Sequence, residues 1–229
     1  MIFNKFLVNI KIGLLNSLTI QVSIYVLQEG DILYNNEDII SIKLKLLKSM
    51  EDSIIKAFKI NFPNDIINPL IKKFIPLEED KKNNLTDIRN NYLKLVKAVL
   101  NNWKRAGLEL TTYVYERHGY SWGKKLKENY NIKLAEDIYK ILKNYNLDGS
   151  LKSSYNITHK DNNTVKFYVK KQILIDTWRE YKINHSIMYD LDRAWKEAFV
   201  NGLNPNFKLQ ATAENIDGID VFVYTIFKK

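Results

Sequence analysis

The clearest pattern of apolar and polar positions lies near the C-terminal end of the chain. Apolar residues recur at steps of three and four over residues 186–200, which predicts an amphipathic helix that ends at Asn201–Gly202. Residues 207–214 and 219–227 then alternate between apolar and polar side chains, as half-buried strands do. The dipeptide Asp217–Gly218 between them favours a tight turn, so the pattern predicts an antiparallel hairpin after the helix.

Alternation also runs through residues 6–14 and 18–26, with Asn16–Ser17 between them, and it predicts a hairpin within residues 1–35. A signal peptide or a membrane span is the alternative for so apolar a segment. Polar side chains, however, interrupt every apolar run well before the roughly 18 residues that a span requires. We therefore expect no membrane association and a cytoplasmic protein.

Residues 36–148 have a mainly helical pattern. A long amphipathic helix is expected over residues 39–58, because its apolar positions fall on one face. The stretch that follows is expected to be broken up by three prolines, which are Pro63, Pro69 and Pro76.

A charged linker at residues 78–84 leads to a second long helix. Thr86 is a good N-cap residue for this helix, which is expected to reach Arg117 with a break at Gly107. A further helix is expected within residues 133–144, since its apolar residues share the helical spacing.

Strands return after a turn near residue 149. Residues 155–158 and 165–173 are expected to join the C-terminal hairpin in one sheet. The predicted class is α+β, with a helical N-terminal half packed on a mostly antiparallel sheet formed largely by the C-terminal part. We expect a single domain over residues 1–229, in which residues 149–229 supply the sheet and the helix at 185–201.

Composition excludes several chemistries. The 229 residues include no cysteine, which excludes disulfides, thiolate metal sites and a cysteine nucleophile. The formal net charge is +9, but only five of the 35 basic residues are Arg, and the lysines are scattered. Abundant Lys, Asn and Ile together indicate an AT-rich genome. We therefore interpret the charge as a solvated surface and do not expect nucleic-acid binding.

One candidate site lies near the end of the second long helix. Glu116 and His118 are candidate catalytic groups for proton transfer, and Arg117 is suited to hold a substrate carboxylate. Tyr120 and Trp122 are candidates for contacts with the substrate. The alternative is a structural helix C-terminus with a glycine cap, where His118 complements the helix dipole.

A second candidate site lies on the C-terminal helix. Asp190 and Asp192 are candidate general bases, and Asp190 is favoured because Tyr189 and Arg193 give it a polar setting. Arg193 would bind a substrate carboxylate, while Tyr189 and Trp195 would wall the pocket. The alternative is that Asp190 and Arg193 form a plain surface ion pair.

Motifs for metals and cofactors do not accompany these residues. His118, His159 and His185 lie far apart and outside any H-x-x-x-H pattern, so we expect no metal site. The sequence also lacks a phosphate loop, a dinucleotide fingerprint and a nucleophile elbow. We therefore expect no cofactor, and the sequence indicates no oligomeric state.

A family resemblance arises at the C-terminal helix. The run Tyr189–Trp195, followed by Gly202–Pro205 and by Asp217–Asp220, resembles the L-2-amino-thiazoline-4-carboxylic acid hydrolase family. It is distantly similar to the small-ligand domains named for 4-vinyl reductases. The resemblance covers about residues 150–227. It implies an α+β domain with a small-molecule pocket between helices and sheet, and for the hydrolases it implies opening of a cyclic C–N bond.

Relatives of the hydrolase type typically carry cysteines near the Asp-bearing helix and in the final strand, where this chain has Met188–Asp190 and Asp220–Phe222. A carboxylate-activated water would have to replace the thiol. The leading hypothesis is an enzyme for hydrolysis, or a related C–N bond reaction, on an amino-acid-like or heterocyclic substrate. A non-catalytic small-ligand-binding or sensor module and a nucleic-acid-associated basic protein are the alternatives.

Overall fold

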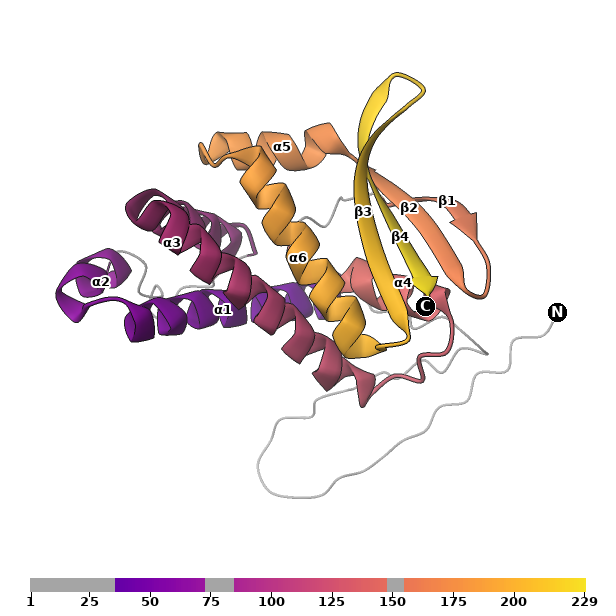
Figure 1. The fold of residues 1–229 in the computed structure, drawn as a ribbon, viewed down its shortest axis with the longest axis horizontal. Coiled ribbons are helices and arrows are strands. Elements are labelled where there is room, and N and C mark those ends of the chain that lie inside the picture. Colours follow the sequence, from indigo (N-terminus) through magenta and orange to yellow (C-terminus); the bar gives the residue numbers. More distant parts are fainter. Residues whose placement is uncertain (1–35, 73–84, 148–154) are drawn as a thin grey trace. The chain divides into compact units, whose positions relative to one another are not determined.

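The computed structural model describes residues 36–72, 85–147 and 155–229, all within one compact unit. Helices dominate its N-terminal half, and a four-stranded antiparallel sheet lies near the C-terminus (Figure 1). The predicted α+β class is therefore confirmed. The hairpin predicted within residues 1–35 and the linker at 78–84 lie outside the described residues, and the single-domain assignment stays a prediction.

The first long helix, α1, spans Asn36–Asn61 and buries one apolar face, as its spacing predicts. A short helix, α2, follows at Asn64–Ile71, where the prolines were expected to break up the chain. The expectation is confirmed at Pro63, which lies between α1 and α2 and has a φ of −57° that suits a helix start. Pro76 lies outside the described residues. Pro69 lies inside α2 and does not end it.

The second long helix, α3, spans Leu85–Lys127 and is longer than expected. It begins before Thr86, so Thr86 is not its N-cap, and it continues well past Arg117. The expected break at Gly107 is replaced by a kink at Lys104, whose φ of 45° and ψ of −120° are not helical. Its last turns contain Gly119 and Gly123, where the alternative interpretation placed a glycine cap.

Those glycines allow α3 to pack closely against α6, which spans His185–Leu203. A Cβ atom on Gly119 would lie 2.4 Å from the carbonyl oxygen of Trp195, and one on Gly123 would lie 2.2 Å from that of Phe199. Gly202 was expected to end the C-terminal helix, but α6 runs past it. A Cβ there would lie 2.4 Å from the carbonyl oxygen of Tyr120. All three glycines thus serve the contact between the two helices.

The sheet has the strand order β1-β2-β4-β3, and every neighbouring pair is antiparallel. Asp217 and Gly218 both have positive φ, 51° and 81°, as a tight two-residue hairpin turn requires. The predicted C-terminal hairpin is therefore confirmed. The strands are β1 (Asn156–Lys160), β2 (Thr164–Lys170), β3 (Phe207–Ile216) and β4 (Ile219–Lys228).

The strand expected over residues 165–173 ends early, because β2 stops at Lys170 and helix α5 begins at Lys171. Leu174, Ile175 and Trp178 are buried at helical spacing, so tertiary packing favours a helix over residues 171–180. Helices α4 (Ala135–Asn144), α5 and α6 contact the sheet, and α6 lies between α3 and β3 (Figure 1). Within the described ranges, no helix is long and apolar enough to cross a membrane.

Candidate functional site

The candidate residues on α3 separate onto two sides of the helix. His118 is buried and Trp122 is largely covered, whereas Glu116, Arg117 and Tyr120 are exposed. Successive residues on an α-helix are about 100° apart, so neighbours in sequence point in different directions. The sequence cluster is therefore two sites rather than one.

The inward side carries a buried polar network that we call the His118 cluster, made of Ser49, His118, Trp122 and Trp195. Ser49 Oγ lies 2.8 Å from His118 Nε2, and the indole of Trp122 donates to the same oxygen at 3.1 Å. Ser49 Oγ donates to the carbonyl oxygen of Leu46 at 2.9 Å. The indole Nε1 of Trp195 donates to His118 Nδ1 at 2.9 Å. All polar atoms of the cluster thus have partners.

A serine beside a histidine invites comparison with nucleophilic enzymes, but the hydrogen bonds exclude that role here. Indole nitrogen is only a donor, so Nδ1 of His118 must accept. In a neutral imidazole the other nitrogen, Nε2, then carries the proton and donates to Ser49. A general base must accept the proton of the nucleophile, and this tautomer cannot.

Burial also fixes the charge of His118. Desolvation lowers the pKa of its imidazole to about 4, so the ring is neutral near pH 7. It therefore does not complement a helix dipole, and α3 continues for more than two turns beyond it. The geometry supports a structural role for His118, and it gives no support to the predicted proton transfer.

A second buried network, the Asp192 cluster, joins α6 to the sheet through Asp192, Lys196 and Tyr224. The Lys196 ammonium donates to Asp192 Oδ2, and Tyr224 donates to the same oxygen at 3.1 Å. Lys196 also lies 4.5 Å from the centre of the Tyr224 ring. Only 1% of Lys196 and 7% of Asp192 are exposed. The opposite charges compensate each other within the interior.

A small cavity of about 20 Å³ lies beside the Asp192 cluster. Asp192 lines it together with Tyr92 and Tyr115, whose hydroxyl groups are hydrogen-bonded to each other. Burial raises the pKa of both phenols, so both stay protonated. A cavity of this size holds about one water molecule. The interior therefore has polar groups but little space.

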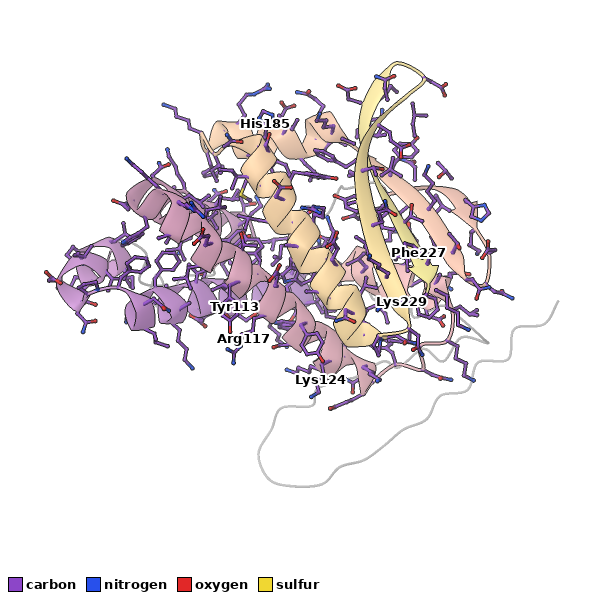
Figure 2. All side chains as sticks on the ribbon, viewed as in Figure 1. Tyr113, Arg117, Lys124, His185, Phe227 and Lys229 are labelled. Atoms are coloured by element: carbon purple, nitrogen blue, oxygen red, sulfur yellow. The ribbon has the colours of Figure 1, made fainter. Side chains whose placement is uncertain are left out.

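The outward side of α3 borders a much larger hollow, which we call the α3–α6 groove. Its volume is about 490 Å³, and it is shallow and wide open to solvent. Tyr113 and Arg117 follow one another along α3 (Figure 2), and Arg117 Nη1 donates to the Tyr113 hydroxyl at 3.1 Å. The groove is lined by Tyr113, Glu116, Arg117, Tyr120, Ala194, Glu197, Ala198 and Asn201.

Charges of both signs meet in the groove. Within the described residues, neither Glu116 nor Arg117 belongs to an ion pair. Glu197 has Arg193 at 3.7 Å. Desolvation raises the pKa of the Glu197 carboxyl, nearby Arg193 lowers it, and Glu116 adds to the rise. The groove thus offers hydrogen-bonding groups of both charges beside two exposed tyrosine rings.

The candidate residues of α6 also separate. Asp192 is the buried carboxylate, while Asp190 is exposed and forms an ion pair with Arg193 at 3.3 Å. Of the two candidate bases, Asp192 and not the favoured Asp190 is therefore the buried carboxylate. Tyr189 stacks on Phe222 with ring centres 4.2 Å apart, and Trp195 is fully buried against α3. The structure leaves the predicted catalytic and binding roles untested.

Several polar residues of these sites escaped the sequence reasoning, namely Ser49, Tyr92, Tyr115, Lys196, Glu197 and Tyr224. Lys196 and Glu197 had a usable signal, because they lie four residues after Asp192 and Arg193 on the same helix. His159 and His185 lie far from His118 in the sequence, and both are exposed whereas His118 is buried. Within the described part of the chain, no group of three or more acidic or histidine residues is placed to hold a metal ion.

Comparison with known proteins identifies no family. No family model matches the chain, and no curated protein matches it. Among solved structures, a Cs H-NOX mutant with 4-cyano-L-phenylalanine has a TM-score of 0.44 at 11% identity, over 78% of this chain and 94% of that one. A mutant of T. Tengcongensis H-NOX has a TM-score of 0.44 at 12% identity, over 82% and 97%.

A third structure, described as modulating heme redox potential through protein-induced porphyrin distortion, has a TM-score of 0.41 at 12% identity, over 76% of this chain and 96% of that one. Similarity at this level does not assign a function. The sequence-based assignments to the L-2-amino-thiazoline-4-carboxylic acid hydrolase family and to 4-vinyl-reductase domains are nevertheless wrong. No family model supports them, and four of the structures found are described as H-NOX proteins. The hypothesis of a hydrolase rested on these assignments and is therefore wrong as well.

Proposed function

We propose that this chain is a non-catalytic module that binds a small polar molecule in the α3–α6 groove. One observation carries the proposal: a hollow of about 490 Å³ in which side chains of both charges lie beside two exposed tyrosines. A few placed polar groups suffice to orient a small ligand. Tyrosine rings add apolar contact area and hydrogen bonds at the same time.

The interior supports ligand binding less well. Its buried charges compensate each other in the Asp192 cluster, and the adjacent cavity of about 20 Å³ has room for about one water molecule. A larger guest would have to displace well-packed side chains. The groove needs no such rearrangement, because its walls already face solvent.

The interior around His118 and the Asp192 cluster offers no place for heme. Heme iron needs an axial ligand such as histidine or tyrosine. The buried His118 has both ring nitrogens in hydrogen bonds, and the hydroxyls of Tyr92 and Tyr115 bind each other. The adjacent cavity of about 20 Å³ is also far too small for a porphyrin. The proposed ligand is therefore a smaller polar molecule in the groove.

A binding role is favoured over catalysis because the groove lacks an activated nucleophile. Its carboxylates, Glu116 and Glu197, have no histidine or serine partner among the hydrogen bonds of the described residues. The Ser49–His118 pair lies on the other side of α3 and has the wrong tautomer for a general base.

The proposal is tested by NMR of the ¹⁵N-labelled full chain with a panel of amino acids, aromatic acids and aromatic amines. Ligands of the groove should shift the backbone amides of residues 113–120 and 194–201. Ala198→Trp places a large ring in the groove and should abolish these shifts. Ala106→Trp is the matched control, since Ala106 is exposed on α3 outside the groove.

Binding in the interior cavity would give a different pattern of amide shifts. Shifts confined to the surroundings of Tyr92 and Trp178, which line that cavity, would contradict the proposal. So would a panel in which no compound shifts the groove amides. Equal binding by wild type and Ala198→Trp would also exclude the groove as the site.

A further inference from the structure

The α3–α6 groove is lined by one cation and two carboxylates. Arg117 lines it from α3 and belongs to no ion pair within the described residues. Glu116 and Glu197 line the same hollow. Desolvation raises the pKa of the Glu197 carboxyl, and the charge of Glu116 contributes to the rise, so the two carboxylates lie close enough to repel each other. The groove thus offers a partner to a negative group and to a positive group of one ligand.

Arg117 and Tyr113 together suit a carboxylate. They lie one turn apart on α3 (Figure 2), and Arg117 Nη1 donates to the Tyr113 hydroxyl at 3.1 Å. Because the hydroxyl oxygen accepts this bond, the phenolic proton is left to donate to a ligand. A guanidinium has five N–H donors, and among the hydrogen bonds of the described residues Arg117 uses one. Such a set of donors matches the two oxygens of a carboxylate.

Glu197 suits an ammonium group. It is half-buried on α6, and Arg193 and Lys208 already lower the pKa of its carboxyl. Neither of these cations lines the groove, however, and the guanidinium of Arg193 is shared between Glu197 at 3.7 Å and Asp190 at 3.3 Å. An ammonium group beside Glu116 and Glu197 would offset their repulsion and donate charge-assisted hydrogen bonds.

The remaining wall of the groove is apolar and held in place. Ala194 and Ala198 line it from α6, and the exposed ring of Tyr120 lines it from α3. Behind it, a Cβ atom on Gly202 would lie 2.4 Å from the carbonyl oxygen of Tyr120, so the two helices are in close contact. A wall that is already in place costs little to order when a ligand binds. The small alanines leave room for an aromatic ring against Tyr120.

We infer that the ligand of the α3–α6 groove is a zwitterionic aromatic amino acid. Its carboxylate binds to Arg117 and Tyr113. Its ammonium group binds to Glu116 and Glu197, and its ring packs against Tyr120. A ligand with a carboxylate alone would meet the two glutamates without compensation, and a ligand with an ammonium group alone would meet the charge of Arg117. The inference rests on the proposed function, because it names the class of ligand for the same site.

The experiment compares phenylalanine with two analogues that each lack one charge, 3-phenylpropionate and phenethylamine. NMR titrations of the ¹⁵N-labelled full chain follow the amides of residues 113–120 and 194–201. We expect phenylalanine to bind about 5- to 10-fold more tightly than either analogue, as one exposed charged hydrogen bond implies. Equal or weaker binding of phenylalanine would overturn the inference. Groove shifts with the analogues would then still support the proposed function, whereas no groove shifts with any compound would contradict both.

Two substitutions test which side chain holds which charge. Glu197→Gln keeps the shape and removes the negative charge, so phenylalanine should lose most of its advantage over 3-phenylpropionate and keep its advantage over phenethylamine. Arg117→Met should have the reverse effect. Glu128→Gln is the matched control, since Glu128 is exposed and does not line the groove, and it should change neither ratio. Unchanged ratios in both groove variants would also overturn the inference.

Discussion

The two sides of α3 carry similar residue types in very different states. On the inward side, His118 is neutral and each of its nitrogens is bonded to another side chain. On the outward side, Glu116 and Arg117 are exposed and free of ion pairs within the described residues. Burial turns polar groups into parts of the scaffold, because each must find a partner in the interior. Groups that face solvent keep their hydrogen-bonding capacity for a ligand.

The largest expected effect lies in the interior. Asp192→Ala should lower the free energy of unfolding by about 3–5 kcal/mol, because it leaves the buried ammonium of Lys196 without its counter-charge. Asp190→Ala is the matched control on the same helix. Its exposed pair with Arg193 should be worth at most about 1 kcal/mol. Chemical denaturation measures both, and similar losses would contradict the assignment of structural and surface roles.

The next effect concerns pH and His118. Its pKa is lowered to about 4 in the folded state, so the unfolded chain binds more protons between about pH 6.5 and pH 4. The stability that the neutral His118 imidazole contributes is fully present above pH 6.5 and is lost as pH falls through 4. We expect a loss on the order of 2–3 kcal/mol, measured by denaturation at each pH, and no such loss in His118→Gln.

Glu51 has the opposite effect on the pH dependence of stability. Its carboxyl therefore has to be removed before the effect of His118 is measured. Desolvation raises the pKa of its carboxyl to about 7, although the amide of Asn91 donates to it. The folded state then binds more protons than the unfolded chain between about pH 4.5 and 7, so this contribution falls as pH rises. The His118 measurement therefore belongs in a Glu51→Gln background, and the difference between the two backgrounds reports Glu51.

A smaller effect on stability is expected at the close contact between α3 and α6. Gly119→Ala would place a Cβ atom 2.4 Å from a backbone oxygen of α6, so the helices must move apart. We expect a loss of about 1–3 kcal/mol in the free energy of unfolding. Ser121→Ala, at an exposed position two residues away, should change it little. A neutral Gly119→Ala would show that the contact between α3 and α6 adapts freely.

The smallest effect on stability should come from the groove itself. Arg117→Met should alter the free energy of unfolding by about 0.5 kcal/mol or less, because the side chain is exposed and only donates to Tyr113. The same change should weaken ligands that carry a carboxylate by roughly tenfold, as loss of a charged hydrogen bond implies. A large loss of stability would place Arg117 with the scaffold instead.

Much of the fold follows from local patterns in the sequence. The C-terminal hairpin was predictable because Asp217–Gly218 and the alternation on both sides of it agree. The sequence alone does not reveal the role of Gly119 and Gly123, because a helix cap and a close helix contact both favour glycine. Only the partner, here the backbone of α6 against Gly119 and Gly123, distinguishes the two uses. That partner is far away in sequence.

The sites were less predictable than the fold. Sequence reasoning found Glu116, Arg117 and Tyr120, yet it joined them to His118, which faces the other way. It also favoured Asp190 over Asp192, because a polar neighbourhood in sequence was taken for one in space. Tyr224 had no signal at all, since a tyrosine in an alternating strand is usually a core residue.

The turn at Asp217–Gly218 has a consequence for the order of folding. β3 and β4 are joined by this turn alone, and β1 and β2 are also consecutive, so each hairpin closes a short loop. The central pair, β2 with β4, is instead separated by α5, α6 and β3. Short loops close early and long ones slowly. The seam between β2 and β4 should therefore form last, and α4 and α5, which both contact β2 and β4, are the helices that bring the two hairpins together.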